Sequence, residues 1–329
     1  MFSLENKKIL YIGQNFFGYE KEIKLMMESM GAHVDYYNER PNDNFLTKVL
    51  IRLRLKIIIN VIINKYYSDL LLEIKNTRYD YVLILKIETI DEKILKKLKE
   101  NQSDAEFILY MWDSIKNYRN NEKILPYFDK AFSFDRSDSC LYKGLKFLPL
   151  FYIPAYENNV DNKIKYDLCF VGSAHSDRYQ IVKKISQISN NLNLNMYVFL
   201  FLQSKAYYLF RKVFDKRMWQ ARKDDFSFIP LNQEKILELI SQSNVIIDIE
   251  HPGQTGLTMR TMEMLGSKKK LITTNKSISE YDFYNENNIC IIDRDEIKIK
   301  KSFFDTPYVS IDAKIYEKYS LHNWIKSIF

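Results

Sequence analysis

Short apolar runs typical of β-strands alternate with helix-length segments along almost the whole chain, and this alternation limits the possible folds. The run KILYIG (8–13) precedes YEKEIKLMMESMG (19–31), whose apolar residues recur at helical spacing, and HVDYYN (33–38) follows. Similar runs recur as far as NICIID (288–293). Strands separated by helices pair in parallel, so the sequence predicts doubly wound α/β sheets.

The alternation pauses once, between residues 146 and 167, where two prolines and a polar run indicate a linker. We therefore expect two tandem Rossmann-like domains, residues 1–150 and 151–311, facing each other across a cleft. A chain of 329 residues is long for one core, which favours the same division. The last residues, 312–329, predict a terminal helix that packs back across the first domain.

Composition is typical of a soluble globular protein, because 46% of the residues are apolar and 28% are charged. Cys140, Cys169 and Cys290 are widely spaced, so neither a disulfide framework nor a zinc site is expected. The chain has no run of about 18 uninterrupted apolar residues, and its first residues lack the apolar core of a signal peptide. We therefore expect a cytoplasmic protein.

The stretch from Asp248 to Asn275 has the form of a phosphate-binding loop. The apolar run NVIIDIE leads to Gly253 and Gly256, which permit close backbone approach, and a helix is expected to begin at Leu257. A helix N-terminus carries unpaired N–H groups and a partial positive charge. Such a terminus is a ready site for phosphate.

Thr258 and Arg260 add a hydroxyl and a fork of N–H donors to this loop. Arg260 and Glu263 are three residues apart and share one helical face, so one can meet a diphosphate while the other meets ribose hydroxyls. The alternatives are a solvated Glu263 and a simple surface charge at Arg260.

The segment GLTMRTMEMLGSKKKLITTN (256–275) is similar to the C-terminal donor-site segment of GT-B glycosyltransferases. The similarity is greatest to those of bacterial capsule and lipopolysaccharide synthesis and to the spore-maturation CgeB-like group. The resemblance implies that Glu263 binds ribose. It also implies that Gly256, Leu257 and Thr258 present backbone amides to the diphosphate of an activated sugar.

The segment YDLCFVGSAHSDR (166–178) resembles the first strand and loop of the family's C-terminal domain. This likeness implies that Gly172, Ser173 and Arg178 lie opposite the diphosphate loop. The two segments cover most of residues 165–295, whereas the first half matches only in its general pattern.

The resemblance implies a glycosyltransferase that moves a sugar from a nucleotide-activated donor to a saccharide or lipid-linked acceptor. The process would be synthesis of a bacterial surface polysaccharide, namely capsule, O-antigen or lipopolysaccharide. The nucleotide-sugar is then a substrate, and no cofactor is expected.

One position departs from the family pattern. Many retaining members carry two glutamates eight residues apart, but here Thr255 lies eight residues before Glu263. Contacts to the donor sugar must therefore differ, with Gln254 and His251 as the candidates, and the stereochemical outcome is left open. His251 before Pro252 has two interpretations, which are a strand cap and a nucleotide contact like the His-Pro pair of transferases that use CMP donors.

The resemblance places the acceptor in the first domain, so the catalytic base is expected there. Asp113 ends AEFILYMWD and Glu88 follows YVLILKI, both at carboxyl ends of expected strands, where ligands gather. Either carboxylate can take a proton from an acceptor hydroxyl within hydrogen-bond reach, and Asp113 is preferred. The alternative for both residues is capping of the next helix.

Asp293 and Asp295 form a D-x-D pattern, which binds Mn²⁺ or Mg²⁺ in a different glycosyltransferase fold. Here the pattern follows the last expected strand, away from the expected diphosphate. We therefore expect both side chains to be solvated and the site to hold no metal.

Residues 45–67 contain five basic residues and no acidic residue, with Lys48, Arg52 and Lys56 spaced every four residues. Two interpretations remain open, which are a buried helix with a solvated edge and an interfacial helix that holds the protein peripherally on an anionic membrane. The basic and aromatic run KAYYLFRKVFDKRMWQARK (205–223) gives surface binding further support.

Two other functions fit the sequence less well. A nicotinamide-dependent nucleotide-sugar dehydrogenase or epimerase would share a Rossmann domain, but GQNFFG (13–18) lacks the G-x-G-x-x-G spacing. The Y-x-x-x-K spacings that begin at Tyr179 and Tyr208 follow no such loop. A nucleic-acid-binding protein would explain the net charge of +7, but that charge is modest for the length and accompanies no nucleic-acid-binding motif.

Overall fold

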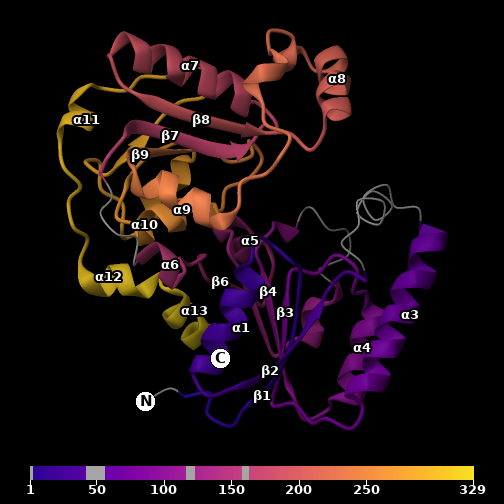
Figure 1. Ribbon diagram of the computed structural model, residues 1–329. Helices are drawn as coiled ribbons and strands as arrows, with labels where there is room; N and C mark the ends of the chain where they lie inside the picture. The colour runs from indigo at the N-terminus through magenta and orange to yellow at the C-terminus, as the bar shows by residue number, and fades with distance from the viewer. Residues whose placement is uncertain (1–2, 42–55, 116–122, 158–162) are drawn as a thin grey trace. The chain divides into compact units, whose positions relative to one another are not determined.

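The computed structural model describes residues 3–41, 56–115, 123–157 and 163–329. The chain divides into two compact units, residues 1–149 with 321–329 (unit 1) and residues 150–320 (unit 2) (Figure 1). Each unit contains a parallel sheet with helices between its strands. The expected class, two doubly wound α/β domains in tandem, is confirmed.

The strands of unit 1 lie in the spatial order β2-β1-β3-β4-β5-β6, and each pair is parallel. They are β1 (Lys8–Gly13), β2 (His33–Asn38), β3 (Tyr81–Leu85), β4 (Glu106–Met111), β5 (Lys130–Ser133) and β6 (Leu145–Phe147). The helices are α1 (Tyr19–Ser29), α3 (Lys56–Ile74), α4 (Glu92–Asn101), α5 (Arg136–Leu141) and α13 (Leu321–Ile328). The strand order reverses between β1 and β3, so the loops after these strands flank the point at which such sheets bind ligands.

The sequence of β4 is almost continuously apolar because nearly all of its residues are buried. Its residues from Phe107 to Met111 are all buried, as expected for a central parallel strand covered by helices on both faces. α4 contributes Leu95 and Leu98 to the same core. It begins after Asp91, whose side chain caps the helix by accepting a hydrogen bond from the Ile94 N–H at 2.9 Å.

The last helix, α13, belongs to unit 1. Trp324 is buried and meets the ring of Tyr110 in β4 edge-on, with the ring centroids 4.8 Å apart. Lys130 Nζ in β5 donates to the carbonyl oxygen of Phe329 at 2.7 Å. Residues 312–329 are thus divided between the two units, because α12 (Ala313–Lys318) belongs to unit 2 and α13 belongs to unit 1.

The strands of unit 2 lie in the order β11-β10-β9-β7-β8, again in parallel. They are β7 (Tyr166–Ser173), β8 (Met196–Phe201), β9 (Ser243–Asp248), β10 (Lys270–Thr273) and β11 (Ile289–Ile291). The helices are α6 (Pro154–Glu157), α7 (Arg178–Asn191), α8 (Lys205–Phe214), α9 (Gln233–Ser241), α10 (Met259–Gly266), α11 (Ser302–Asp305) and α12. The switch in strand order falls between β7 and β9.

The basic segment 45–67 is described only in part, because residues 42–55, with Lys48 and Arg52, lie outside the described residues. The remainder opens α3, which buries Ile63 and Tyr67 in the core of unit 1 and leaves Val61 and Ile62 exposed. No described helix is long and apolar enough to cross a bilayer.

Gly266, the last residue of α10, lies against the buried ring of Tyr152. A Cβ added at Gly266 would lie 2.8 Å from both Cβ and Cγ of Tyr152. Replacing Gly in a helix gains at most about 1 kcal/mol, whereas overpacking a rigid contact costs about 1–3 kcal/mol, and more where the neighbour cannot move. We therefore expect Gly266→Val to lower the melting temperature by several degrees, at about 2–4 °C per kcal/mol.

Gly253→Val is the matched control, because a Cβ at this exposed glycine would meet nothing closer than 3.6 Å. Thermal unfolding followed by circular dichroism measures both variants. An equal decrease in the melting temperature of the two variants would contradict the close packing of α10 against Tyr152.

Candidate functional site

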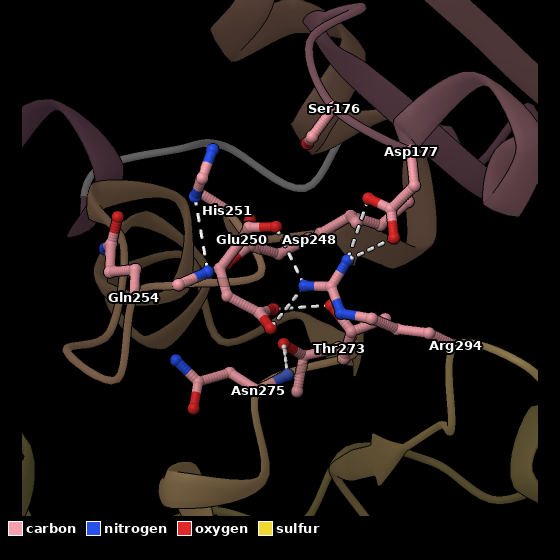
Figure 2. Close-up of polar contacts among 12 residues, drawn as sticks. Ser176, Asp177, Asp248, Glu250, His251, Gln254, Thr273, Asn275 and Arg294 are labelled. Atoms are coloured by element: carbon pink, nitrogen blue, oxygen red, sulfur yellow. Dashed lines mark hydrogen bonds and ion pairs between the residues drawn. The ribbon is translucent and has the colours of Figure 1, made fainter. Parts of the chain in front are cut away.

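Polar side chains of unit 2 gather at the carboxyl edge of its sheet, around the switch point between β7 and β9 (Figure 2). They come from four loops, with Ser176 and Asp177 after β7, Glu250, His251 and Gln254 after β9, Asn275 after β10, and Arg294 after β11. Open α/β sheets bind their ligands at this edge. The cluster is therefore the candidate site.

One guanidinium joins three of these loops. Arg294 Nη1 lies 2.8 and 2.9 Å from the two carboxylate oxygens of Asp177. Its Nη2 lies 2.5 Å from Glu250 Oε1 and donates to the Glu250 carbonyl oxygen at 2.9 Å. Burial lowers the pKa of Arg294, but the hydrogen bonds and charges of Glu250 and Asp177 outweigh this and raise it above its usual value. Arg294 thus acts as a fixed positive charge at the site.

The loop after β10 joins this network through two side chains. Thr274 Oγ1 donates to Oε2 of the buried Glu250 at 2.5 Å. Asn275 is also buried, and its Nδ2 donates to the carbonyl oxygens of Thr255 and Gly256 at 3.2 and 3.3 Å. Asn275 therefore fixes the backbone of the glycine loop that precedes α10.

Thr258 caps α10, and its hydroxyl is used within the protein. Its Oγ1 accepts a hydrogen bond from the Thr261 N–H at 3.3 Å and donates to Asp248 Oδ2 at 2.5 Å. Thr261 Oγ1 donates to the same oxygen at 2.8 Å. The buried Asp248 carboxylate lies near a helix N-terminus, where negative charge is favourable. A ligand at this terminus would thus meet backbone groups and not this hydroxyl.

Arg260 and Glu263 lie on one face of α10, as their spacing predicts. Their side chains form an ion pair with Arg260 Nη1 2.5 Å from Glu263 Oε2. Glu263 is buried, so the alternative of a solvated Glu263 is wrong. Its contact with ribose stays a prediction.

The segment after β7 reaches the same edge. Gly172 and Ser173 end β7, and Arg178 begins α7. Arg178 Nε donates to the carbonyl oxygen of Ile249 at 2.6 Å, and its Nη1 donates to that of Ser173 at 3.3 Å. Burial lowers the pKa of Arg178, and the negative charge of Asp248 partly offsets this. Arg178 thus ties the end of β7 to the residue that directly follows β9.

Two histidines lie side by side at the site, and sequence reasoning found only His251. The ring centroids of His175 and His251 are 5.9 Å apart. Burial, and then the positive charge of Arg178, lower the pKa of His175 to about 4, so its ring is neutral at neutral pH. His251 Nδ1 accepts the Gly253 N–H at 3.2 Å, and Gln254 Nε2 donates to the Gly256 carbonyl oxygen at 3.0 Å.

The two aspartates of the D-x-D pattern, Asp293 and Asp295, are exposed as expected. Arg294, which lies between them, is part of the site. Asp293 pairs with Lys276 at 2.9 Å, and this hydrogen bond lowers the pKa of the Asp293 carboxyl to about 2. Within the described ranges, no three His, Cys, Asp or Glu side chains are grouped so that they could hold a metal ion.

Sequence reasoning missed Asp177, Glu250, Asn275 and Arg294. Each lies within a few residues of the carboxyl end of a strand, which is the rule that identified Glu88 and Asp113. Applied to unit 2, the same rule would have selected them. Their pairing carries no local signal, because the partners of Arg294 lie 117 and 44 residues away.

In unit 1, Glu88 and Asp113 follow β3 and β4 at the carboxyl edge of the sheet, as predicted. Glu88 Oε2 accepts a hydrogen bond from Arg40 Nε at 2.8 Å and also contacts Arg40 Nη2. The same oxygen accepts a hydrogen bond from Gln14 Nε2 at 2.9 Å. Asp113 lies 3.3 Å from Lys86 Nζ. Its side chain is 34% exposed against 13% for Glu88, so Asp113 is the more accessible carboxylate.

The loop after β1 does not have the form of a pyrophosphate-binding turn. The buried Glu20 carboxylate accepts the Phe16 N–H at 2.9 Å, and Gln14 Nε2 donates to the buried Glu39 at 3.1 Å. A carboxylate thus occupies the start of α1, where a dinucleotide would place its anionic pyrophosphate. This counts against the nicotinamide-dependent alternative.

The sequence matches no protein-family model and no curated protein. Its fold, however, is similar to that of several solved structures over nearly the whole chain. The lipopolysaccharide outer core galactosyltransferase WaaB is 11% identical over 98% of both chains, with a TM-score of 0.53. HepE of Anabaena, solved with UDP and glucose, is 9% identical over 98% of this chain and 99% of its own, with a TM-score of 0.58.

A third structure, the UDP-GlcNAc 2-epimerase of Methanocaldococcus jannaschii, is 11% identical over 97% of this chain and 99% of its own, with a TM-score of 0.51. At these identities the likeness concerns the fold alone. The two parallel sheets of this chain correspond to the two Rossmann-like domains of GT-B proteins.

Proposed function

We propose that this protein is a glycosyltransferase that binds a nucleotide-sugar in unit 2 and transfers its sugar to an acceptor hydroxyl. The observation that carries the proposal lies at the switch point of the unit 2 sheet, where Arg294 joins the loops after β7, β9 and β11, and Thr274 ties the loop after β10 to Glu250. The GT-B fold, with UDP and glucose bound in the structure of HepE, supports it.

In this proposal, backbone amides of Gly256, Leu257 and Thr258 face the diphosphate. Glu263 binds ribose, and Arg260 beside it supplies positive charge at the start of α10. A helix N-terminus and a guanidinium both stabilise the negative charge that develops on a leaving diphosphate.

Five further residues complete the proposed donor site. Gly172, Ser173 and Arg178 line the β7 side, and Gln254 and His251 are placed to contact the donor sugar. Their positions at the end of β7, at the start of α7 and on the loop after β9 support this assignment.

Asp113 is the proposed catalytic base for the acceptor, and Glu88 is the second candidate. A carboxylate that takes the hydroxyl proton needs access to substrate. The exposure of Asp113 and the tight contact of Glu88 with Arg40 favour Asp113. In the reaction, the acceptor oxygen bonds to the anomeric carbon of the sugar while the bond to the diphosphate breaks.

The proposed process is bacterial surface polysaccharide synthesis, in a capsule, O-antigen or lipopolysaccharide pathway. The resemblance of residues 165–295 to capsule, lipopolysaccharide and CgeB-like enzymes supports this, as does the fold of WaaB. A saccharide or lipid-linked acceptor follows from the same proposal. The protein would act in the cytoplasm, with residues 45–67 holding it peripherally on an anionic membrane.

The proposal predicts that a nucleotide stabilises the protein. In a thermal-shift panel of UDP, GDP, dTDP and CMP at millimolar concentration, we expect at least one nucleotide to raise the melting temperature. A ligand that binds only the native state adds about 2.7 kcal/mol when present at a hundred times its dissociation constant. Absence of a shift with all four would remove the main support for a transferase.

Glu263→Gln keeps the volume of a buried side chain and removes its charge. We expect this variant to bind the stabilising nucleotide about 1–3 kcal/mol more weakly, the range for losing a charged hydrogen-bond partner. Isothermal titration calorimetry measures the loss. The exposed Glu234→Gln, in α9, is the matched control, and equal affinities in the two variants would reduce Glu263 to a structural partner of Arg260.

We propose that transfer needs no divalent metal, because the start of α10 and Arg260 supply the positive charge. Release of the nucleoside diphosphate from the donor should therefore proceed at the same rate with and without EDTA. Loss of turnover in EDTA and its recovery on addition of Mn²⁺ would reject this mechanism.

The fold of the UDP-GlcNAc 2-epimerase favours one second candidate, a nucleotide-sugar epimerase that uses the same unit 2 site. Product analysis separates the two functions. An epimerase changes UDP-GlcNAc without an added acceptor, whereas a transferase needs the acceptor for its glycosidic product.

A further inference from the structure

Helix α8 of unit 2 presents an apolar stripe to solvent. Leu209, Phe210, Val213 and Phe214 are 62%, 58%, 65% and 73% exposed. Their spacing of one, three and four residues places them on one face of the helix. Figure 1 shows α8 standing out from the sheet of unit 2.

The inner face of α8 is anchored by polar groups. Tyr208 is buried and donates to the Ala221 carbonyl oxygen at 3.0 Å. Buried Arg211 contacts the Ala174 carbonyl oxygen and pairs with Asp215 at 2.6 Å. Lys212 Nζ donates to the carbonyl oxygens of Trp219 and Ala221, both at 2.6 Å. An ordinary surface helix buries its apolar stripe, so this orientation is inverted.

The stripe continues beyond the helix. Trp219, after the end of α8, is 56% exposed, and Tyr207, near the start of α8, is 41% exposed. Exposed apolar side chains are common singly, but a contiguous group rimmed by polar residues marks an interaction surface. Trp and Tyr side chains are enriched where a protein meets the interface of a bilayer.

Positive charge borders the stripe. Residues 205–225 contain seven basic and three acidic residues. Two of the acidic side chains are held within the protein, since Asp215 accepts from Arg211 and Arg217, and Asp225 accepts from Tyr179 at 2.8 Å. Lys205, Lys216 and Lys223 are exposed.

We propose that the α8 face, Tyr207 to Trp219, binds the surface of an anionic lipid bilayer. The apolar stripe would enter the boundary between headgroups and acyl chains, and the basic rim would face acidic headgroups. A ten-residue helix is about 15 Å long. It is too short to cross a hydrocarbon core of about 30 Å, so it would lie in the plane of the membrane.

The same charges disfavour a second copy of the chain as the occupant, because pairing two such faces would bring like charges together. The inference does not depend on the proposed function. The proposed nucleotide site lies in the loops around Arg294, so a negative result for nucleotide binding would not affect the proposal for α8, and the reverse is also true. It also concerns a segment of unit 2, whereas residues 45–67 belong to unit 1.

Vesicle co-sedimentation of the full chain tests the proposal. The probes are phosphatidylcholine vesicles with phosphatidylserine and vesicles of phosphatidylcholine alone. We expect preferential binding to the anionic vesicles. Phe210→Ser with Phe214→Ser should reduce the partition coefficient on the order of tenfold or more, since burying one aromatic ring is worth about that factor.

Leu25→Ser with Leu141→Ser, at two equally exposed leucines of unit 1, is the matched control and should bind like the unchanged protein. Melting temperatures confirm that both double variants fold. Absence of vesicle binding, or equal binding by both double variants, would overturn the proposal. Self-association that the Phe210 and Phe214 changes abolish, without vesicle binding, would make this face an interface between copies and would overturn it too.

Discussion

The candidate site depends on one ion pair, between Arg294 and the buried Glu250. Glu250 lies in the protein interior, and an unpartnered buried carboxylate costs about 3–5 kcal/mol. Arg294 removes that cost and uses its remaining donor positions on Asp177. Loops that could each move separately are therefore held in one arrangement before any ligand arrives. Preorganised dipoles and charges of this kind are what a site needs to stabilise developing charge without rearranging.

Unit 1 contains a comparable buried glutamate that holds a neighbouring loop. Glu39, directly after β2, is fully buried, and its Oε1 accepts the N–H groups of Glu88 and Ile90 at 2.8 and 3.2 Å. Burial raises the pKa of Glu39, although these hydrogen bonds oppose the change. In both units a buried glutamate after one strand fixes the loop after another. The difference is that Glu39 is satisfied mainly by backbone groups, whereas Glu250 depends on a long-range arginine.

Much of the fold follows from residues that are close in the sequence. The apolar run of β4 and the capped, amphipathic α4 have local signals, so their type could be predicted. The shared helical face of Arg260 and Glu263 is local too. The partners of Arg294 are far along the chain, and the D-x-D pattern drew attention to the wrong side chains. The apolar stripe of α8 can be predicted from the spacing of its residues. Only the packing of the helix shows that Tyr208 and Arg211 face the interior and that the stripe faces solvent.

Amide hydrogen exchange with and without the stabilising nucleotide tests the central claim most directly. If the nucleotide binds at the carboxyl edge of the unit 2 sheet, exchange should slow most strongly in residues 172–178 and 250–260, on either side of the switch point between β7 and β9. Slowing confined to unit 1, or no slowing at a nucleotide concentration that saturates the thermal shift, would contradict the placement of the donor site around Arg294.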